Sequence, residues 1–131
     1  MAKRDAEVEE AYARFSLYIL ARWATMEDYI RVTRLGWTEG RGRGCDSRRI
    51  AVRRSRGQAI YFEPNRFPYA GAEGAHWILW ADRAMSRPVV QKYLEARLGP
   101  GVPFHFYVNR RSKQSVPGVW HAHVFLGAVG A

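Results

Sequence analysis

The sequence predicts an α+β fold, an antiparallel sheet of about four strands with an N-terminal helical hairpin and one further helix packed against it. Three observations support this class. Apolar residues recur at three- and four-residue steps near the N-terminus, short β-prone runs fill the second half of the chain, and helices and strands segregate instead of alternating. The 131 residues, 47% of them hydrophobic, are enough for a single domain with one core.

The helical N-terminal part is expected to span residues 1–36. Over residues 6–23 the apolar side chains fall on one helical face, and carboxylates lie early in the segment, where they suit a helix N-terminus. Thr25 followed by Asp28 resembles a capping box and predicts a second, shorter helix that Gly36 stops. We therefore expect one amphipathic hairpin or a kinked pair of helices.

A core of sheet plus helix is expected over residues 58–127. Its β-prone runs are residues 58–63, 76–81, 103–109 and 119–127. The spacing of the last two runs suits an antiparallel hairpin with a broad loop.

The third helix is expected to begin after Ser86 and to end at Gly99, with all helices against one face of the sheet. Its spacing predicts an inward-facing stripe that consists of Val89, Val90, Tyr93, Leu94 and Leu98.

Positive charge is concentrated in residues 41–56, which we expect to form an arginine-rich loop. This window holds seven arginines and one aspartate, or +6 of the net charge of +9. Because guanidinium groups bind oxyanions through paired donors, the window predicts contact with phosphate or nucleic acid. The candidate contact residues are Arg48, Arg49, Arg53, Arg54 and Arg56. The alternative is a solvated loop in a chain of arginine-rich composition.

The chain is expected to be a soluble protein of the cytoplasm or nucleus with no membrane partner. No run approaches the roughly 18 apolar residues of a membrane helix, and the first ten residues are charged rather than signal-like. The single cysteine, Cys45, excludes an internal disulfide framework, which fits an intracellular setting.

Two histidines, His121 and His123, lie one residue apart in a run that otherwise resembles a buried strand. Side chains two positions apart on a strand point to the same face, so the imidazoles are expected opposite Ala122 and Val124. The small apolar residues predict the core face, which leaves the histidine face for function. His121 and His123 are therefore the candidate catalytic residues.

Other polar residues bracket the same strands, at positions from which a pocket draws its orienting contacts. The candidate ligand-binding residues are Asn65, Tyr69, His76, His105, Asn109 and Ser115. Converging neutral imidazoles could bind a phosphorylated ligand, transfer protons, or hold a divalent metal with His121 and His123 as ligands. The alternative is that each histidine forms only a local hydrogen bond at a sheet edge.

The His-apolar-His spacing also resembles the second motif of the HUH endonucleases, in which paired histidines hold a metal for single-strand DNA cleavage. That resemblance implies a tyrosine nucleophile on a helix. No tyrosine follows His123 in this sequence, so the candidate is Tyr93, because relaxase-type members place their tyrosine upstream. Tyr93 also lies on the apolar stripe of its helix, where core packing is the alternative.

A longer series of motifs covers about half of the chain. In order, they are NRFPY at residues 65–69, HWILW at 76–80, FYVN at 106–109 and QSVPGVWHAHVF at 114–125. Together they resemble the fungal N-acetylglucosamine-induced protein 1-like family, a domain of unknown function. The resemblance implies an association with amino-sugar response and no settled biochemistry, and the arginine-rich part departs from the family pattern.

The favoured function is binding of a phosphorylated small ligand, such as a nucleotide or sugar nucleotide, at a pocket of histidine, asparagine and arginine on the sheet. Whether the ligand is also processed stays open, as do the cofactor and the oligomeric state. One alternative is a nucleic-acid-binding module that acts through the arginine-rich loop. The other is an HUH-like, metal-dependent single-strand nuclease.

Overall fold

The computed structural model describes residues 3–42, 44–53, 59–110 and 114–127. In chain order its elements are α1 (Ala6–Leu20), α2 (Met26–Thr33), β1 (Thr38–Arg41), β2 (Arg49–Arg53), β3 (Ile60–Pro64), β4 (His76–Ala81), α3 (Arg87–Leu98), β5 (Phe104–Tyr107) and β6 (Trp120–Leu126). None of the helices in these ranges is long and apolar enough to cross a membrane.

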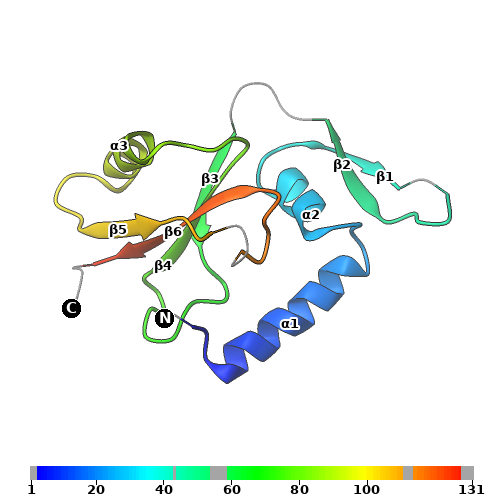
Figure 1. Cartoon of the computed structure of the whole chain (residues 1–131), viewed down its shortest axis with the longest axis horizontal. Coiled ribbons are helices and arrows are strands. Elements are labelled where there is room, and N and C mark those ends of the chain that lie inside the picture. Colours follow the sequence, from blue (N-terminus) through cyan, green and yellow to red (C-terminus); the bar gives the residue numbers. More distant parts are fainter. Residues whose placement is uncertain (1–2, 43, 54–58, 111–113, 128–131) are drawn as a thin grey trace.

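The central sheet has four antiparallel strands in the order β3-β4-β6-β5, and β1 and β2 form a separate antiparallel pair (Figure 1). The predicted α+β class is confirmed, and so is the antiparallel pairing of the last two strands. The loop expected over residues 41–56 is wrong in part, because β1 ends and β2 begins within it. β2 alternates arginine with apolar residues, and such alternation suits a strand as well as a charged loop.

One face of the central sheet is covered by α3. Val90 and Leu94 of this helix pack with Leu79, Ala122 and Val124, and all five side chains are at most 1% exposed. Val89 is 51% exposed and does not join the predicted inward stripe. Neighbouring residues on a helix point about 100° apart, so Val89 and Val90 cannot both face the sheet.

The opposite face is covered by the N-terminal helices, so the helices do not share one face as expected (Figure 1). Ile30 of α2 packs beside Ile78 and Trp80 of β4. The start of α2 agrees with the sequence prediction, because the Thr25 hydroxyl oxygen accepts a hydrogen bond of 3.0 Å from the Asp28 amide. The sheet is therefore enclosed between α3 and the α1–α2 pair.

Candidate functional site

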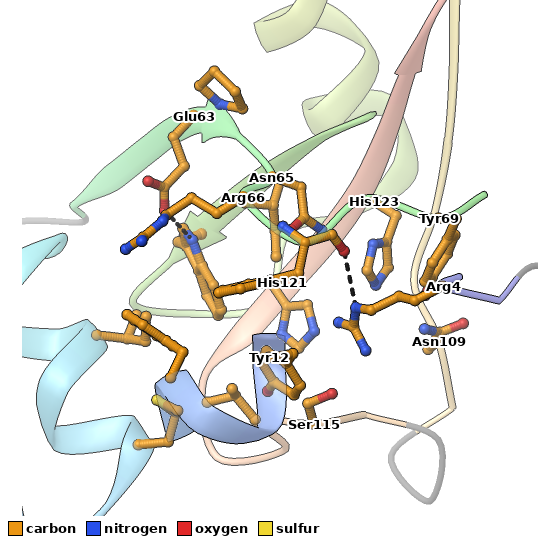
Figure 2. A pocket seen from close by; sticks show the side chains of 18 of the residues that line it. Arg4, Tyr12, Glu63, Asn65, Arg66, Tyr69, Asn109, Ser115, His121 and His123 are labelled. Atoms are coloured by element: carbon orange, nitrogen blue, oxygen red, sulfur yellow. Dashed lines mark hydrogen bonds between the residues drawn. The ribbon is translucent and has the colours of Figure 1, made fainter. Parts of the chain in front are cut away.

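A cavity of about 580 Å³ lies on the α1–α2 side of the central sheet. Its lining comes from β3, β4 and β6, from the segments that follow β3 and β5, and from α1, α2 and the residues before α1. Both His121 and His123 line it, and Figure 2 shows their rings projecting from β6 to the same side. The cavity is of a size that suits a small-molecule ligand.

The alternation of β6 places the two histidines. Ala122 and Val124 are fully buried against the α3 side, while His121 and His123 are 4% and 5% exposed on the other side. This arrangement agrees with the two faces expected from the sequence. In the sheet, His121 pairs with Trp80 and His123 pairs with Ile78 of β4, and both partners also line the cavity.

The protonation of His123 follows from a chain of hydrogen bonds that begins at Tyr69. The Tyr69 amide lies 3.1 Å from His76 Nδ1 and can only donate, so this nitrogen carries the lone pair and the His76 proton is on Nε2. His76 Nε2 therefore donates to His123 Nδ1 at 2.8 Å. Neutral His123 then carries its own proton on Nε2. The Asn65 amide nitrogen approaches His76 Nε2 at 3.4 Å, which is too long to compete with the shorter bond.

His121 has the opposite tautomer. Its Nδ1 lies 2.9 Å from the carbonyl oxygen of Val119, which can only accept, so Nδ1 carries the proton and Nε2 carries the lone pair. Among the described residues, no fully buried side-chain nitrogen or oxygen lacks a hydrogen-bond partner. Neither Nε2 atom has a partner there, so both open onto the cavity. The pair thus presents one acceptor, from His121, and one donor, from His123.

Burial keeps these imidazoles uncharged at neutral pH. It lowers the pKa of His76 to about 4, with a smaller contribution from the charge of Arg4. Burial also lowers the pKa of His123 to about 3, and His76, His121 and Arg4 add to this effect. The pKa of His121 is lowered by burial as well, although its bond to the Val119 carbonyl works in the other direction.

Arg4 supplies a positive charge beside the histidines (Figure 2). Its Nε donates to the Phe67 carbonyl oxygen at 2.8 Å, and its guanidinium carbon lies 4.3 Å from the centre of the Tyr12 ring. Glu9 is 3.5 Å from the guanidinium, with a carboxylate side chain that is 59% exposed. Arg4 is therefore held in place, with its side chain only 15% exposed.

A second charged pair in the lining, Arg34 and Glu63, is bonded to itself and is not available to a ligand. Arg34 Nε donates to a carboxylate oxygen of Glu63 at 3.0 Å, and Trp80 Nε1 donates to the same oxygen at 2.9 Å. Burial by itself would lower the pKa of Arg34, but the hydrogen bonds and charges of Glu63 and Tyr29 together outweigh burial and raise this pKa. These two charges largely balance, so Arg4, Arg66 and Lys3 are the cations that remain for a ligand.

The candidate ligand-binding residues divide into two groups. Asn65, Tyr69, Asn109 and Ser115 line the cavity with the two β6 histidines. His76 does not line it but is buried behind His123, where it fixes the His123 proton.

His105 does not belong to the cavity. It is exposed on the edge strand β5, where its ring stacks on Phe125 with 5.1 Å between centroids. It projects to the same face as His123, because it pairs with Phe125 and both Phe125 and His123 lie on that face of β6. His105 therefore lies on the histidine face of the sheet but outside the cavity, because the cavity does not extend to the edge strand.

Several lining residues are not among those predicted from the sequence, among them Arg4, Tyr12, Glu63, Arg66 and Trp80. Arg4 and Tyr12 reach the cavity because the N-terminal segment and α1 lie across the sheet, more than 100 positions from β6 in sequence. The NRFPY turn contains Arg66 and offered the one available signal, a basic residue inside a recognised motif.

The arginine-rich window lies apart from the cavity as far as the structure describes it. Arg48 bonds to Asp46, with 2.9 Å between Nη2 and Oδ2, and this hydrogen bond lowers the pKa of Asp46 to about 2. Arg49 lies 3.6 Å from the Glu39 carboxylate. The backbone of Arg53 belongs to β2, and Arg54 and Arg56 lie outside the described residues. Neither Arg48 nor Arg49 lines the cavity.

The metal hypothesis required several histidines to converge on one point, and the nuclease hypothesis also required Tyr93 to lie near His121 and His123. Within the described ranges, no group of three or more His, Cys, Asp or Glu side chains is arranged to hold a metal ion. The bond between His76 and His123 occupies the lone pair of His123 Nδ1. Tyr93 packs with the cluster under α3, on the opposite face of the sheet from His121. The candidate nucleophile therefore cannot reach the histidine pair.

Comparison with known proteins places the fold and the family. No curated protein matches the chain. A solved structure described as "Crystal Structure of HTC1" is 21% identical, with a TM-score of 0.58 over 96% of this chain and 76% of that one, which shows a shared fold. A family model described as "Protein of unknown function (DUF3605)" matches residues 1–127, so the chain belongs to that family.

Proposed function

We propose that the cavity binds a phosphorylated small ligand such as a nucleotide or sugar nucleotide. The observation that carries this proposal is the fixed pair of Nε2 atoms, one acceptor and one donor, beside the partly buried side chain of Arg4. Phosphate oxygens accept hydrogen bonds from N–H groups and pair with guanidinium. Four basic and two acidic side chains line the cavity, a net charge of +2 that favours an anion.

The rest of the lining suits the organic part of such a ligand. Tyr12 and Phe67 meet edge to face with 5.1 Å between centroids, and Phe15 lies 5.2 Å from Phe67. This aromatic wall offers apolar surface for a base or a sugar ring. Ser115 offers a hydrogen bond near His121, and Asn109 offers one near Arg4 and Tyr69 (Figure 2). The N-acetylglucosamine-induced protein 1-like resemblance favours a sugar nucleotide within this class, because that family is associated with amino-sugar response.

The nucleic-acid alternative has less support. Arg48 and Arg49 have side chains that are 40% and 43% exposed and do not line the cavity. Arg4 also has a carboxylate beside it, but its side chain is 15% exposed and lines the cavity, and charges are screened less where water is excluded. The nuclease alternative required Tyr93 as the nucleophile, and Tyr93 packs on the opposite face of the sheet from the histidine pair.

Calorimetric titration with UDP-glucose, ATP and inorganic phosphate tests the proposal. We expect saturable binding of at least one of the two nucleotides by the wild-type protein, and a loss of more than about 10-fold in affinity in both Arg4→Ala and His121→Ala. His105→Ala is the matched control, because it removes an exposed histidine of the same sheet outside the cavity. Binding that is equal in all four proteins would overturn the proposal.

A further inference from the structure

We propose that His121 is a covalent nucleophile, whose Nε2 attacks a phosphorus atom of a bound phosphoanhydride to form a phosphohistidine intermediate. This inference rests on the proposed function, because it requires a phosphorylated ligand in the cavity. It adds a reaction, a reacting atom and a substrate class to the binding site.

The nucleophile is prepared by its hydrogen bond to the backbone. A histidine in water exchanges its proton between the two ring nitrogens, so its lone pair is on Nε2 for only part of the time. Here the Val119 carbonyl holds the proton on Nδ1 at 2.9 Å, and the lone pair of Nε2 opens onto the cavity. The same carbonyl stabilises the positive charge that develops on the ring when Nε2 forms a bond.

The groups beside His121 suit the charge of a phosphoryl transition state. His123 Nε2–H is a ring donor beside His121, and the two ring centroids are 5.7 Å apart, a separation at which one phosphoryl group can contact both rings. His123 cannot rotate freely, because His76 donates to its Nδ1 at 2.8 Å and is itself held by the Tyr69 amide. Arg4 adds a fixed positive charge. Preorganised donors of this kind stabilise the oxygens of the transferred group.

The same neighbours restrict the leaving group. His123 is neutral, so loss of its Nε2 proton would leave an imidazolate, and a guanidinium keeps its proton at any ordinary pH. Neither group can protonate an alkoxide as it departs. These two groups therefore favour a leaving group that is stable as an anion, as in a phosphoanhydride such as a nucleoside triphosphate or a sugar nucleotide, over a simple phosphate ester of an alcohol.

The reaction balances without a further cofactor. In the first half, the Nε2 lone pair forms the N–P bond, the bridging P–O bond breaks, and its electron pair leaves with the departing group. That group is a nucleoside diphosphate or pyrophosphate from a nucleoside triphosphate, and a sugar phosphate or a nucleotide from a sugar nucleotide. The Nδ1 proton stays on the ring, so the intermediate is a phosphoimidazolium. In the second half, water attacks phosphorus, the N–P electron pair returns to Nε2, and the proton of water is taken up by the phosphate products or the buffer.

Labelling with ATP and UDP-glucose that carry ³²P in each phosphate position tests the inference. The protein is quenched in alkali, because phosphohistidine survives alkali and is lost in acid, and the labelled peptide is identified by mass spectrometry. We expect label on His121 of the wild-type protein, its loss in His121→Ala and its retention in His105→Ala. Circular dichroism checks that the variants fold.

Two outcomes would overturn the inference in different ways. If either nucleotide binds by calorimetry but no alkali-stable label forms, the site is a binder and the proposed function survives alone. If label forms on another residue, or persists in His121→Ala, the assignment of the nucleophile fails. If neither nucleotide binds, the proposed function fails together with the inference.

Discussion

His76 donates a hydrogen bond of 2.8 Å to His123, and this contact links a buried histidine of β4 to a cavity histidine of β6. The Nδ1 atom of His76 accepts a second hydrogen bond, of 3.1 Å, from the Tyr69 amide. His76 is 1% exposed and does not line the cavity. Its role is to position His123, because it decides which nitrogen of His123 carries the proton.

Replacing His76 should therefore cost stability. His76→Leu removes the donor to His123 and the acceptor for the Tyr69 amide, and it leaves two buried polar groups without partners. Each such group costs about 1 to 3 kcal/mol, so the free energy of unfolding in urea should fall by about 2 to 6 kcal/mol. His105→Leu changes an exposed side chain and should alter it by less than about 0.5 kcal/mol. Equal effects of the two substitutions would contradict the buried hydrogen-bond chain.

The depressed pKa values predict a loss of stability in mild acid. His76 and His123 have pKa values of about 4 and about 3 in the folded protein, below the usual 6.5. Between pH 6.5 and 4 the unfolded chain therefore binds more protons than the folded one, so unfolding becomes easier as the pH falls. Each histidine contributes a slope of up to roughly 1.4 kcal/mol per pH unit in this window.

Urea unfolding at pH 7.5, 6.5, 5.5 and 4.5 measures this dependence. Stability should be nearly constant from pH 7.5 to about 7 and should then fall steadily toward pH 4.5. A protein equally stable at pH 7.5 and 4.5 would show that the buried imidazoles are charged or accessible to water in the folded state.

Ligand affinity should depend on the geometry of Arg4 as well as on its charge. Arg4→Lys keeps a positive charge but loses the planar group over Tyr12 and the Nε bond to Phe67. We expect nucleotide affinity to fall by about 3- to 10-fold in Arg4→Lys and by about 10- to 100-fold in Arg4→Ala, as measured by calorimetry. Arg48→Ala, which removes an arginine outside the cavity, should leave affinity unchanged. A larger effect of Arg48→Ala than of Arg4→Ala would favour the arginine-rich window as the site.

A substitution on the α3 face of the sheet should lower the stability of the protein without changing its affinity for a ligand in the cavity on the other face. Leu94 is fully buried between α3 and the sheet, on the side away from the cavity. Leu94→Ala should lower the free energy of unfolding by about 2 to 5 kcal/mol, because it leaves a void in a packed core. Nucleotide affinity should be unchanged in the protein that remains folded. A parallel loss of affinity would mean that the α3 face supports the histidine geometry directly.

The features that the sequence predicted correctly are those that depend on local patterns of residues. The alternation of residues 120–126 assigns His121 and His123 to one face and Ala122 and Val124 to the other, and no long-range information is needed for that assignment. The Thr25 and Asp28 pair likewise marks a helix start through contacts within a single turn. In each case the signal and the structure involve the same few residues.

The features of the site that were not predicted depend on tertiary contacts. Arg4 and Tyr12 line the cavity because α1 lies across the sheet, and the sequence near β6 does not predict their presence there. His105 lies on the same face as His123 but on the edge strand. The strand order that places it at the edge cannot be predicted from local sequence patterns. The charge of residues 41–56 obscured the alternation of β2, since arginine side chains suit a solvent-facing strand as well as a loop.

Long-range ¹H–¹⁵N correlation spectra of the histidine rings at pH 7 measure most directly whether residues 121 and 123 offer a ligand one lone pair and one N–H. We expect His121 as the neutral Nδ1–H form and His123 as the neutral Nε2–H form, with an Nδ1 resonance that changes in His76→Leu. Spectra showing His121 with its proton on Nε2, or either ring doubly protonated, would contradict the site described above.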